Sequence, residues 1–176
     1  MFLPWNLLEQ TVYQQKLLLN PKLMKKITKK TFRGKISLKI LFDTNIILDV
    51  LLNRAPFVDL SANLVSSVEN RVIEGCLCAT TITTLDYLIS KSTNRETARI
   101  EIQKLLALFQ IADVNSTVLS MAINSSFTDF EYAVQYFSGK CGKVDGLVTR
   151  NAKDYKKATQ PIYTPDELWS IISSNT

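Results

Sequence analysis

Histidine is missing from this chain of 176 residues. Its absence excludes Ser-His-Asp and Cys-His catalysis, HExxH metalloproteases and zinc sites that need imidazole. Glycine is scarce, with five residues, and neither a G-x-G-x-x-G turn nor a Walker A loop occurs. Carboxylates therefore remain as the candidates for chemistry. They favour hard cations that prefer oxygen ligands, such as Mg²⁺ or Mn²⁺.

Cysteine is also scarce, and the three residues form an odd set: Cys76, Cys78 and Cys141. An odd number argues against a disulfide framework. Cys76 and Cys78 lie in an apolar segment, where we expect them to act as small buried hydrophobic side chains. A zinc site would need histidine or a fourth cysteine.

Long hydrophobic runs are absent as well. No apolar run approaches the roughly 18–20 residues that a membrane span needs. The first residues lack the basic and then apolar order of a secretory signal. With 46% apolar and 21% charged residues, the composition is that of one globular domain. We therefore expect a cytoplasmic protein with no membrane partner.

Basic residues are concentrated at the start of the chain. Residues 1–39 hold nine Lys or Arg and one acid, whereas residues 40–176 hold twelve basic and fifteen acidic residues. We therefore divide the chain into a basic extension, 1–37, and a domain, 38–176. The extension could bind nucleic-acid phosphates or an acidic partner, or be a solvated linker. Met24 precedes a lysine-rich run and is an alternative start.

From residue 36 onward, the hydrophobic pattern alternates between the periods of strands and helices. Gly75 is predicted to end one helix, and Thr93 with Glu96 matches a capping box that opens another. Expected strands are 38–43, 76–80, 111–114, 144–149 and 161–163. Expected helices are 45–52, 57–74, 83–91, 93–109, 116–124, 130–141 and 165–174. This alternation predicts an α/β fold with a parallel sheet covered on both faces.

Four polar residues are candidates for one site. Asp43 ends the first strand, and ligands of open α/β sheets bind just outside the carboxyl ends of strands. Asn151 would lie at the same edge if the first and fourth strands are neighbours. Asp86 lies one turn into a helix and Asp129 begins another, so both could project there. Carboxylates gathered in one place repel each other unless a cation lies between them, which predicts a divalent metal site.

Each candidate also has an ordinary structural interpretation. Asp43 and Asp129 could be N-caps of the helices that follow them. Asp86 could be an exposed helical acid, and Asn151 a turn residue. Glu131 is about 200° around the helix from Asp129, so we expect it to face elsewhere.

Other polar residues surround these candidates. Asp145, at the start of the fourth strand, is predicted to be structural, because it lies roughly 13 Å from the carboxyl edge. Asp49 is expected to accept hydrogen bonds beneath the site. Arg150 and Lys153 could hold phosphates or be solvated charges.

Three motifs give the chain a family resemblance. They are Leu-Phe-Asp43-Thr-Asn-Ile-Ile-Leu-Asp, Asp129-Phe-Glu-Tyr-Ala-Val-Gln-Tyr and Val144-Asp-Gly-Leu-Val-Thr-Arg-Asn-Ala-Lys-Asp-Tyr. Together, in this order and spacing, they resemble the PIN domain family of metal-dependent nucleases, which includes the VapC-type toxins. The resemblance runs from about residue 38 to residue 168.

The resemblance implies a three-layer α/β/α sandwich about a five-stranded parallel sheet, with an acidic pocket at its carboxyl edge. Asp43 and Asp129 fall on two acidic positions of the family, and Asp86 falls near a position usually held by glutamate. These three would be the metal ligands. Asn151 takes a place where many members have aspartate, which implies weaker binding and one Mg²⁺ or Mn²⁺ ion rather than two.

The activity implied is hydrolysis of RNA phosphodiesters to leave a 5′-phosphate, in an endoribonuclease that is the toxin of a type II toxin–antitoxin pair. A homodimer is a further expectation from the family. One alternative is a catalytically weak RNA-binding module, and another is a partner-binding protein silenced by an antitoxin. A nucleotide-binding domain is disfavoured, because no glycine-rich turn follows the first strand.

Overall fold

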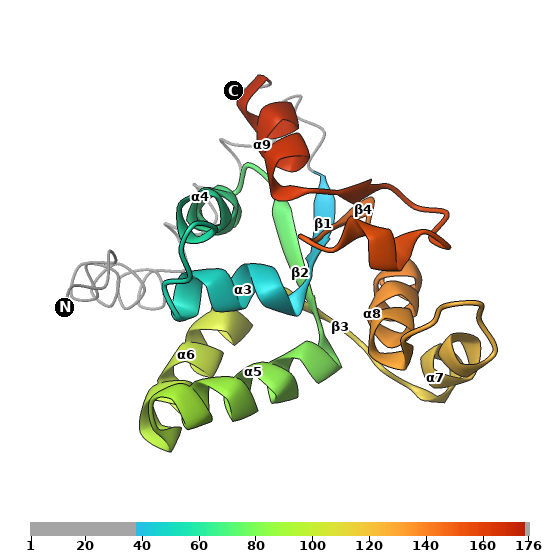
Figure 1. The fold of residues 1–176 in the computed structure, drawn as a ribbon, viewed down its shortest axis with the longest axis horizontal. Helices are drawn as coiled ribbons and strands as arrows, with labels where there is room; N and C mark the ends of the chain where they lie inside the picture. The colour runs from blue at the N-terminus through green and yellow to red at the C-terminus, as the bar shows by residue number, and fades with distance from the viewer. Residues whose placement is uncertain (1–37, 175–176) are drawn as a thin grey trace, which may run out of the picture. The chain divides into compact units, whose positions relative to one another are not determined.

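A computed structural model of the chain describes residues 38–174, so the predicted basic extension over 1–37 and the alternative start at Met24 lie outside the described part. The described part contains a five-stranded sheet in the order β3-β2-β1-β4-β5 (Figure 1). All four pairings between neighbouring strands are parallel. The strands are β1 Lys39–Phe42, β2 Glu74–Cys78, β3 Gln110–Ala112, β4 Gly146–Val148 and β5 Ile162–Tyr163.

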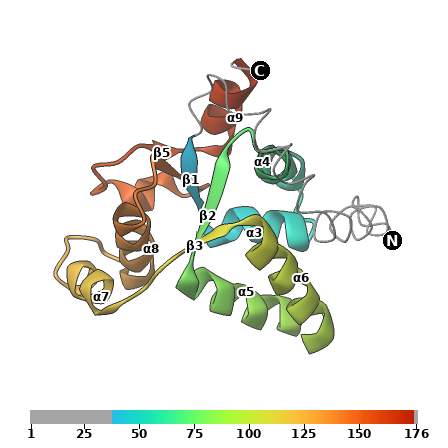
Figure 2. The same cartoon turned by 180° about the vertical axis from the view of Figure 1, so that it is seen from behind.

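Helices cover both faces of this sheet. In Figures 1 and 2, α7 and α8 lie on one side, and α3, α4, α5 and α6 lie on the other. The helices are α3 Thr44–Leu51, α4 Val58–Glu69, α5 Ala79–Ser92, α6 Arg95–Leu108, α7 Ser116–Ile123, α8 Phe130–Cys141 and α9 Pro165–Ser174, with a 3₁₀ turn η1 Ala152–Tyr155. The predicted three-layer α/β/α architecture is confirmed.

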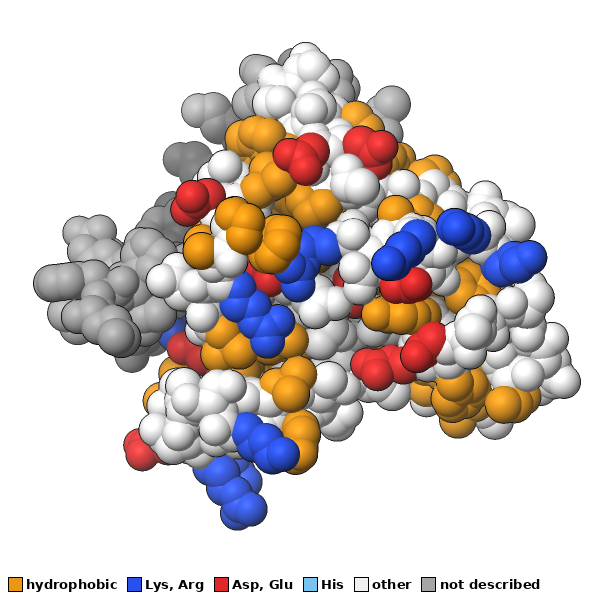
Figure 3. Space-filling model, viewed as in Figure 1, with side chains coloured by type: hydrophobic (Ala, Val, Ile, Leu, Met, Phe, Trp, Pro, Cys, Tyr) orange, Lys and Arg blue, Asp and Glu red, His pale blue; other side chains and the backbone are white. Residues whose placement is uncertain are grey.

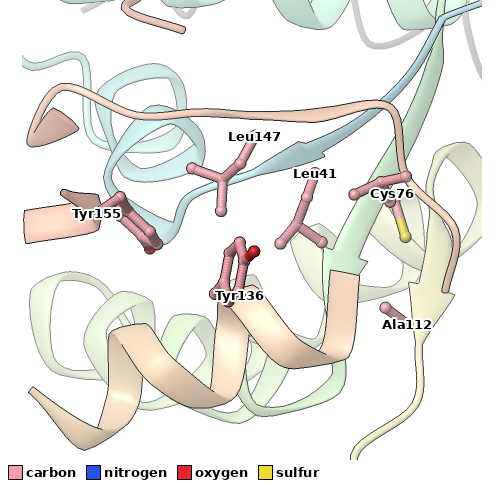
Figure 4. Packing of buried hydrophobic residues seen from close by; sticks show 7 residues of the cluster. Leu41, Cys76, Ala112, Tyr136, Leu147 and Tyr155 are labelled. Carbon is pink, nitrogen blue, oxygen red and sulfur yellow. The ribbon is translucent and has the colours of Figure 1, made fainter. Parts of the chain in front are cut away.

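The central strand β1 is buried on both faces because both layers pack against it. Leu41 points toward α8, where it packs with Tyr136 and with Leu147 of β4 (Figure 4). Phe42, the next residue, turns to the other face and meets the ring of Phe109 edge-on, with 5.3 Å between ring centroids. The apolar run at the start of the domain is thus explained by a strand that contributes to two cores.

The strand order creates the edge at which a site can form. β1 lies between β2 and β4, so the chain leaves β1 toward one side and later returns to its other side. Phe42 is in register with Val148, and the backbone N–H of Asp43 donates to the carbonyl of Val148 at 3.0 Å. The carboxyl ends of β1 and β4 are therefore neighbours, which is the condition on which the predicted meeting of Asp43 with residues 149–151 depended.

Several predicted helix boundaries are wrong; α5, for example, begins at Ala79 and not at residue 83. Gly75 does not end a helix, because α4 ends at Glu69 and Gly75 lies within β2. A Cβ atom at Gly75 would lie 2.6 Å from the Phe109 ring, so this glycine permits close packing. The N-cap of α6 is Asn94 rather than Thr93: its side chain accepts from the N–H of Thr97 at 2.8 Å.

The predicted boundaries of two other helices agree with the structure to the residue. Helix α8 begins after Asp129 and ends at Cys141, and α9 spans the predicted residues. Thr164 and Glu167 form the reciprocal bonds of a capping box at the start of α9. Of the cysteines, Cys76 and Cys78 are buried, as expected. Within residues 38–174, no helix is both long and apolar enough to cross a membrane.

Candidate functional site

Asp43 occupies the carboxyl end of the central strand and is almost completely buried, with 1% of its surface exposed. Its Oδ2 accepts a hydrogen bond from the Thr149 hydroxyl at 2.8 Å and a longer one, 3.5 Å, from the Asn45 amide. Its Oδ1 is buried and has no hydrogen-bond partner. Asp43 stands at the N-cap position of α3, yet its side chain makes no capping bond. The N-cap interpretation therefore leaves this carboxylate unexplained.

The environment of Asp43 opposes a bare negative charge. Burial raises the pKa of the Asp43 carboxyl, and the hydrogen bonds from Thr149 and Asn45 only partly offset this effect. A buried carboxylate oxygen without a partner is rare in proteins and costly. Such an oxygen is satisfied by a proton, an ordered water or a cation. The donor chemistry therefore fits a hard divalent metal at Oδ1.

Asn151 is linked to Asp43 through the hydroxyl of Thr149, which forms a hydrogen bond with each of them. Its backbone N–H donates to the Thr149 hydroxyl at 3.0 Å, and that hydroxyl donates to Asp43. The side-chain amide of Asn151 donates to the hydroxyl of Tyr132 at 3.4 Å. The Tyr132 ring in turn packs on Tyr155, with centroids 5.3 Å apart. Aromatic side chains thus border the site on the α8 side.

Asp129 is the N-cap of α8, as its structural interpretation predicted. Its Oδ1 accepts from the backbone N–H of Tyr132 at 3.1 Å, and the residue is exposed. Glu131 is also exposed, yet it does not simply face elsewhere. Its pKa is raised first by partial burial and then by the negative charges of Asp129 and Asp43. Glu131 is therefore an acid near the site that helical periodicity did not select.

Asp86 is exposed in the middle of α5, and within residues 38–174 its side chain makes no hydrogen bond or ion pair. The first turn of the same helix does reach the site, because the Thr81 hydroxyl lies 3.3 Å from the hydroxyl of Thr44. Throughout the described chain, no three acidic or thiol side chains lie close enough together to hold a metal ion. The structure thus joins Asp43 to Asn151 and leaves Asp86 and Asp129 at the surface.

A buried polar chain underlies the site and was not predicted. The Tyr155 hydroxyl donates to Gln135, the Gln135 amide donates to Thr44, and Thr44 lies against Thr81. These bonds, of 3.3–3.4 Å, link η1, α8, α3 and α5 beneath Asp43. Burial also raises the pKa of Tyr155, so its hydroxyl keeps its proton. Gln135 was the available signal, because it is a polar residue on the buried face of α8.

Asp49, which is buried, and Arg150, which is partly exposed, form an ion pair next to the site. Asp49 is fully buried, as its apolar neighbours in the sequence suggested, and its Oδ2 lies 3.2 Å from Nε of Arg150. The Ser61 hydroxyl donates to the same oxygen at 3.3 Å.

At the opposite edge of the sheet, Asp145 accepts from the backbone N–H of Lys39 at 2.7 Å, the structural role that its position predicted.

Known structures share this fold. A chain of the VapBC2 structure from Rickettsia felis, bound to a DNA fragment from their promoter, matches with a TM-score of 0.55 at 17% identity, covering 72% of this chain and 98% of that one. A chain of FitAB bound to the IR36 DNA fragment gives 0.55 at 17%, covering 72% and 94%. A chain of a toxin–antitoxin complex from Klebsiella pneumoniae also matches at 18% identity. It covers 72% of this chain and 97% of its own length, again with a TM-score of 0.55.

Sequence comparison gives the family. No curated protein sequence matches the chain. A family model described as the PIN domain matches residues 39–153, which include β1, Asp43, the whole of α8 and the Thr149–Asn151 segment. The match covers more than half of the chain, and the sheet order and the fold of the similar structures agree with it. This chain belongs to the PIN domain family.

Proposed function

We propose that this PIN-domain protein is a Mg²⁺- or Mn²⁺-dependent endoribonuclease and the toxin of a toxin–antitoxin pair. The observation that carries the proposal is the Asp43 carboxylate, buried at the junction of β1 and β4 with Oδ1 unpaired. PIN domains are in general nucleases that use divalent metals. A buried acid at the carboxyl edge of the central strand is the expected place for such a metal.

The metal would be held first by Oδ1 of Asp43, because the other oxygen is already bonded to Thr149. Asp129, Asp86 and Asn151 are the further ligands proposed from the sequence. Glu131 joins them as an acid whose pKa responds to the charge of Asp43. A bound Mg²⁺ or Mn²⁺ would lower the pKa of an attacking water and offset the charge that develops on the phosphodiester.

The protein supplies orientation and charge around that position. Thr149 and Asn45 fix the Asp43 carboxylate, and the polar chain from Tyr155 to Thr44 fixes the start of α3. Exposed lysines lie in η1 and just after it, at positions 153, 156 and 157. Figure 3 shows basic side chains over this part of the surface. They would attract the phosphates of an RNA strand in a salt-dependent way.

A protein antitoxin is the proposed partner. One of the structures with a similar fold is a toxin–antitoxin complex, and VapBC2 and FitAB are the others reported above. The proposal for this chain is that a small protein encoded with it would bind the PIN domain and block RNA. Expression of the chain alone should then arrest growth, and Asp43→Asn should relieve the arrest.

The decisive experiment is cleavage of a structured RNA pool in Mn²⁺, Mg²⁺ or EDTA by the native protein and by Asp43→Asn. The matched control is Asp145→Asn, which makes the same chemical change at the opposite edge of the sheet and keeps an oxygen to accept from Lys39. We expect cleavage only with metal, lost in Asp43→Asn and retained in Asp145→Asn. Equal cleavage by both variants, or cleavage in EDTA, would contradict the proposal.

A second candidate function is an RNA-binding module with little or no catalysis. Two observations favour it. In the described chain no three acidic or thiol side chains lie close enough together to hold a metal ion, and the Asn151 amide donates to the Tyr132 hydroxyl. This candidate predicts RNA binding that survives Asp43→Asn and falls steeply with salt, together with no metal-dependent cleavage. The same assay, run beside an RNA-binding titration, separates the two functions.

A further inference from the structure

We propose that Arg150, anchored by Asp49 and stacked on Phe57, is a positioning residue that binds an RNA phosphate beside the Asp43 pocket. The inference rests on the proposed function, since it names how the RNA strand is held at that site. Three segments build it: the end of α3, the start of α4 and, about a hundred positions later, the segment after β4. No family comparison assigns these residues a role.

The anchor is a buried carboxylate. Asp49 has 0% exposure, and its Oδ2 lies 3.2 Å from Nε of Arg150. Nε makes no hydrogen bond, so this contact is an ion pair, and the buried charge of Asp49 holds that edge of the guanidinium inward. The Arg150 side chain nevertheless remains 23% exposed, and within residues 38–174 Asp49 is its one acidic partner. The two terminal nitrogens of the fork are left to face a ligand, and planar forks of this kind bind phosphate with two parallel bonds.

A second contact fixes the plane of the guanidinium. Cζ of Arg150 lies 4.0 Å from the centre of the Phe57 ring, which is a cation–π contact. Phe57 immediately precedes α4 and is 43% exposed, so the ring is not a core residue. An exposed aromatic ring beside an immobilised arginine is a combination that binds single-stranded RNA, through base stacking and phosphate contact together.

The position of Arg150 relates this pair to the chemistry. Arg150 stands between Thr149, which bonds Asp43, and Asn151. A phosphate on Arg150 would therefore be close to the scissile one. Arg54 adds a second positive charge that acts on Asp49, so two cations surround one buried acid. Figure 3 shows basic side chains over α3 next to hydrophobic ones toward α4.

The competing explanation is that Arg150 serves only to neutralise Asp49. To separate the two, we would measure binding of a labelled 12-nucleotide single-stranded RNA in EDTA across a KCl series, with all variants made in the non-cleaving Asp43→Asn protein. The double variant Asp49→Asn with Arg150→Gln removes the proposed contact without leaving a buried charge unpaired. Phe57→Leu tests the aromatic ring alone. Arg99→Gln, an exposed arginine on α6, is the control for loss of one positive charge.

We expect the double variant to weaken RNA binding about tenfold, as the loss of a charge-assisted contact would. It should also flatten the dependence of log Kd on log[KCl] by about 0.7, the value for one phosphate contact on a single strand. Phe57→Leu should weaken binding with an unchanged slope, and Arg99→Gln should change neither. An unaltered Kd and slope in the double variant would overturn the inference and leave the nuclease proposal intact. Failure of the parent protein to bind RNA would overturn both.

Discussion

The hydroxyl of Thr149 donates a 2.8 Å hydrogen bond to Oδ2 of Asp43, joining two residues that are 106 positions apart in the chain. This bond occupies one carboxylate oxygen and leaves the other, Oδ1, buried without a partner. The asymmetry distinguishes Asp43 from Asp129, whose carboxylate is exposed and caps its own helix. A cation at this edge of the sheet would thus approach Asp43 through a single oxygen.

Replacing Asp43 with asparagine should stabilise the protein in the absence of metal. The change removes a buried charge whose Oδ1 is unsatisfied, so we expect the free energy of unfolding to rise by about 1–2 kcal/mol. Urea denaturation in EDTA near neutral pH would measure it. Addition of Mn²⁺ should stabilise the native protein and leave the variant unchanged. A variant less stable than the native protein in EDTA would contradict this assignment.

The same carboxyl should make stability depend on pH. The folded-state pKa of Asp43 is raised by burial, so folding favours its protonated form. Its contribution to stability is then fully present below the unfolded-state pKa of about 3.9 and is lost as pH rises through the folded-state pKa. In EDTA, the stability difference between Asp43→Asn and the native protein should therefore grow above about pH 4. Asp49, whose pKa is also raised by burial, is present in both proteins and should largely cancel. A difference that stays constant with pH would exclude titration of Asp43.

Asn151→Asp should strengthen metal binding. Asn151 is linked to Asp43 through the Thr149 hydroxyl, so a carboxylate there would add negative charge close to the proposed ion. We expect the dissociation constant for Mn²⁺, measured by calorimetry, to fall about tenfold, with some loss of stability in EDTA from repulsion between the two acids. Asn151→Ala is the control that removes the amide without adding charge. Equal affinities in all three proteins would place Asn151 outside the metal site.

Gly75→Ala should destabilise the fold without touching the site. The added methyl group would lie 2.6 Å from the Phe109 ring and 2.8 Å from Val68, so the side chains packed on this face of β2 must shift. We expect a loss of about 1–3 kcal/mol in the free energy of unfolding, measured with urea. Phe109→Leu in the Gly75→Ala background should recover part of it by making room. An alanine variant as stable as the native protein would show that the Phe109 ring moves aside at no cost.

Much of the fold was predictable because its signals are local. The apolar run that ends at Asp43, the cap at Asp129 and the capping box of Thr164 and Glu167 each lie within a few residues, and the structure has all three. Gly75 was misassigned because its local pattern fits the end of a helix equally well. Gly75 packs against Phe109, which lies 34 positions further along the chain. No periodic pattern in the sequence indicates that contact.

The site was predictable only in part for the same reason. Asp43 and Asn151 were predicted because each follows the carboxyl end of a strand. Their proximity required one assumption, that these two strands are neighbours in the sheet. The anchoring of Arg150 by Asp49 and Phe57 joins three segments, and no spacing in the sequence records it. The influence of Asp43 on Glu131 likewise depends on how α8 is oriented over the sheet, which helical periodicity alone does not give.

The strand order has a consequence for synthesis of the protein. The Asp43 side of the pocket leaves the ribosome early, but the strand that completes it, β4, ends only at Val148, and Thr149 follows. Until then one edge of the central strand has no neighbour and Asp43 lacks its main hydrogen-bond donor. A polypeptide released before that point carries the first acid without its surroundings. Chains that end before Thr149 therefore lack the complete Asp43 pocket on which the proposed nuclease activity depends.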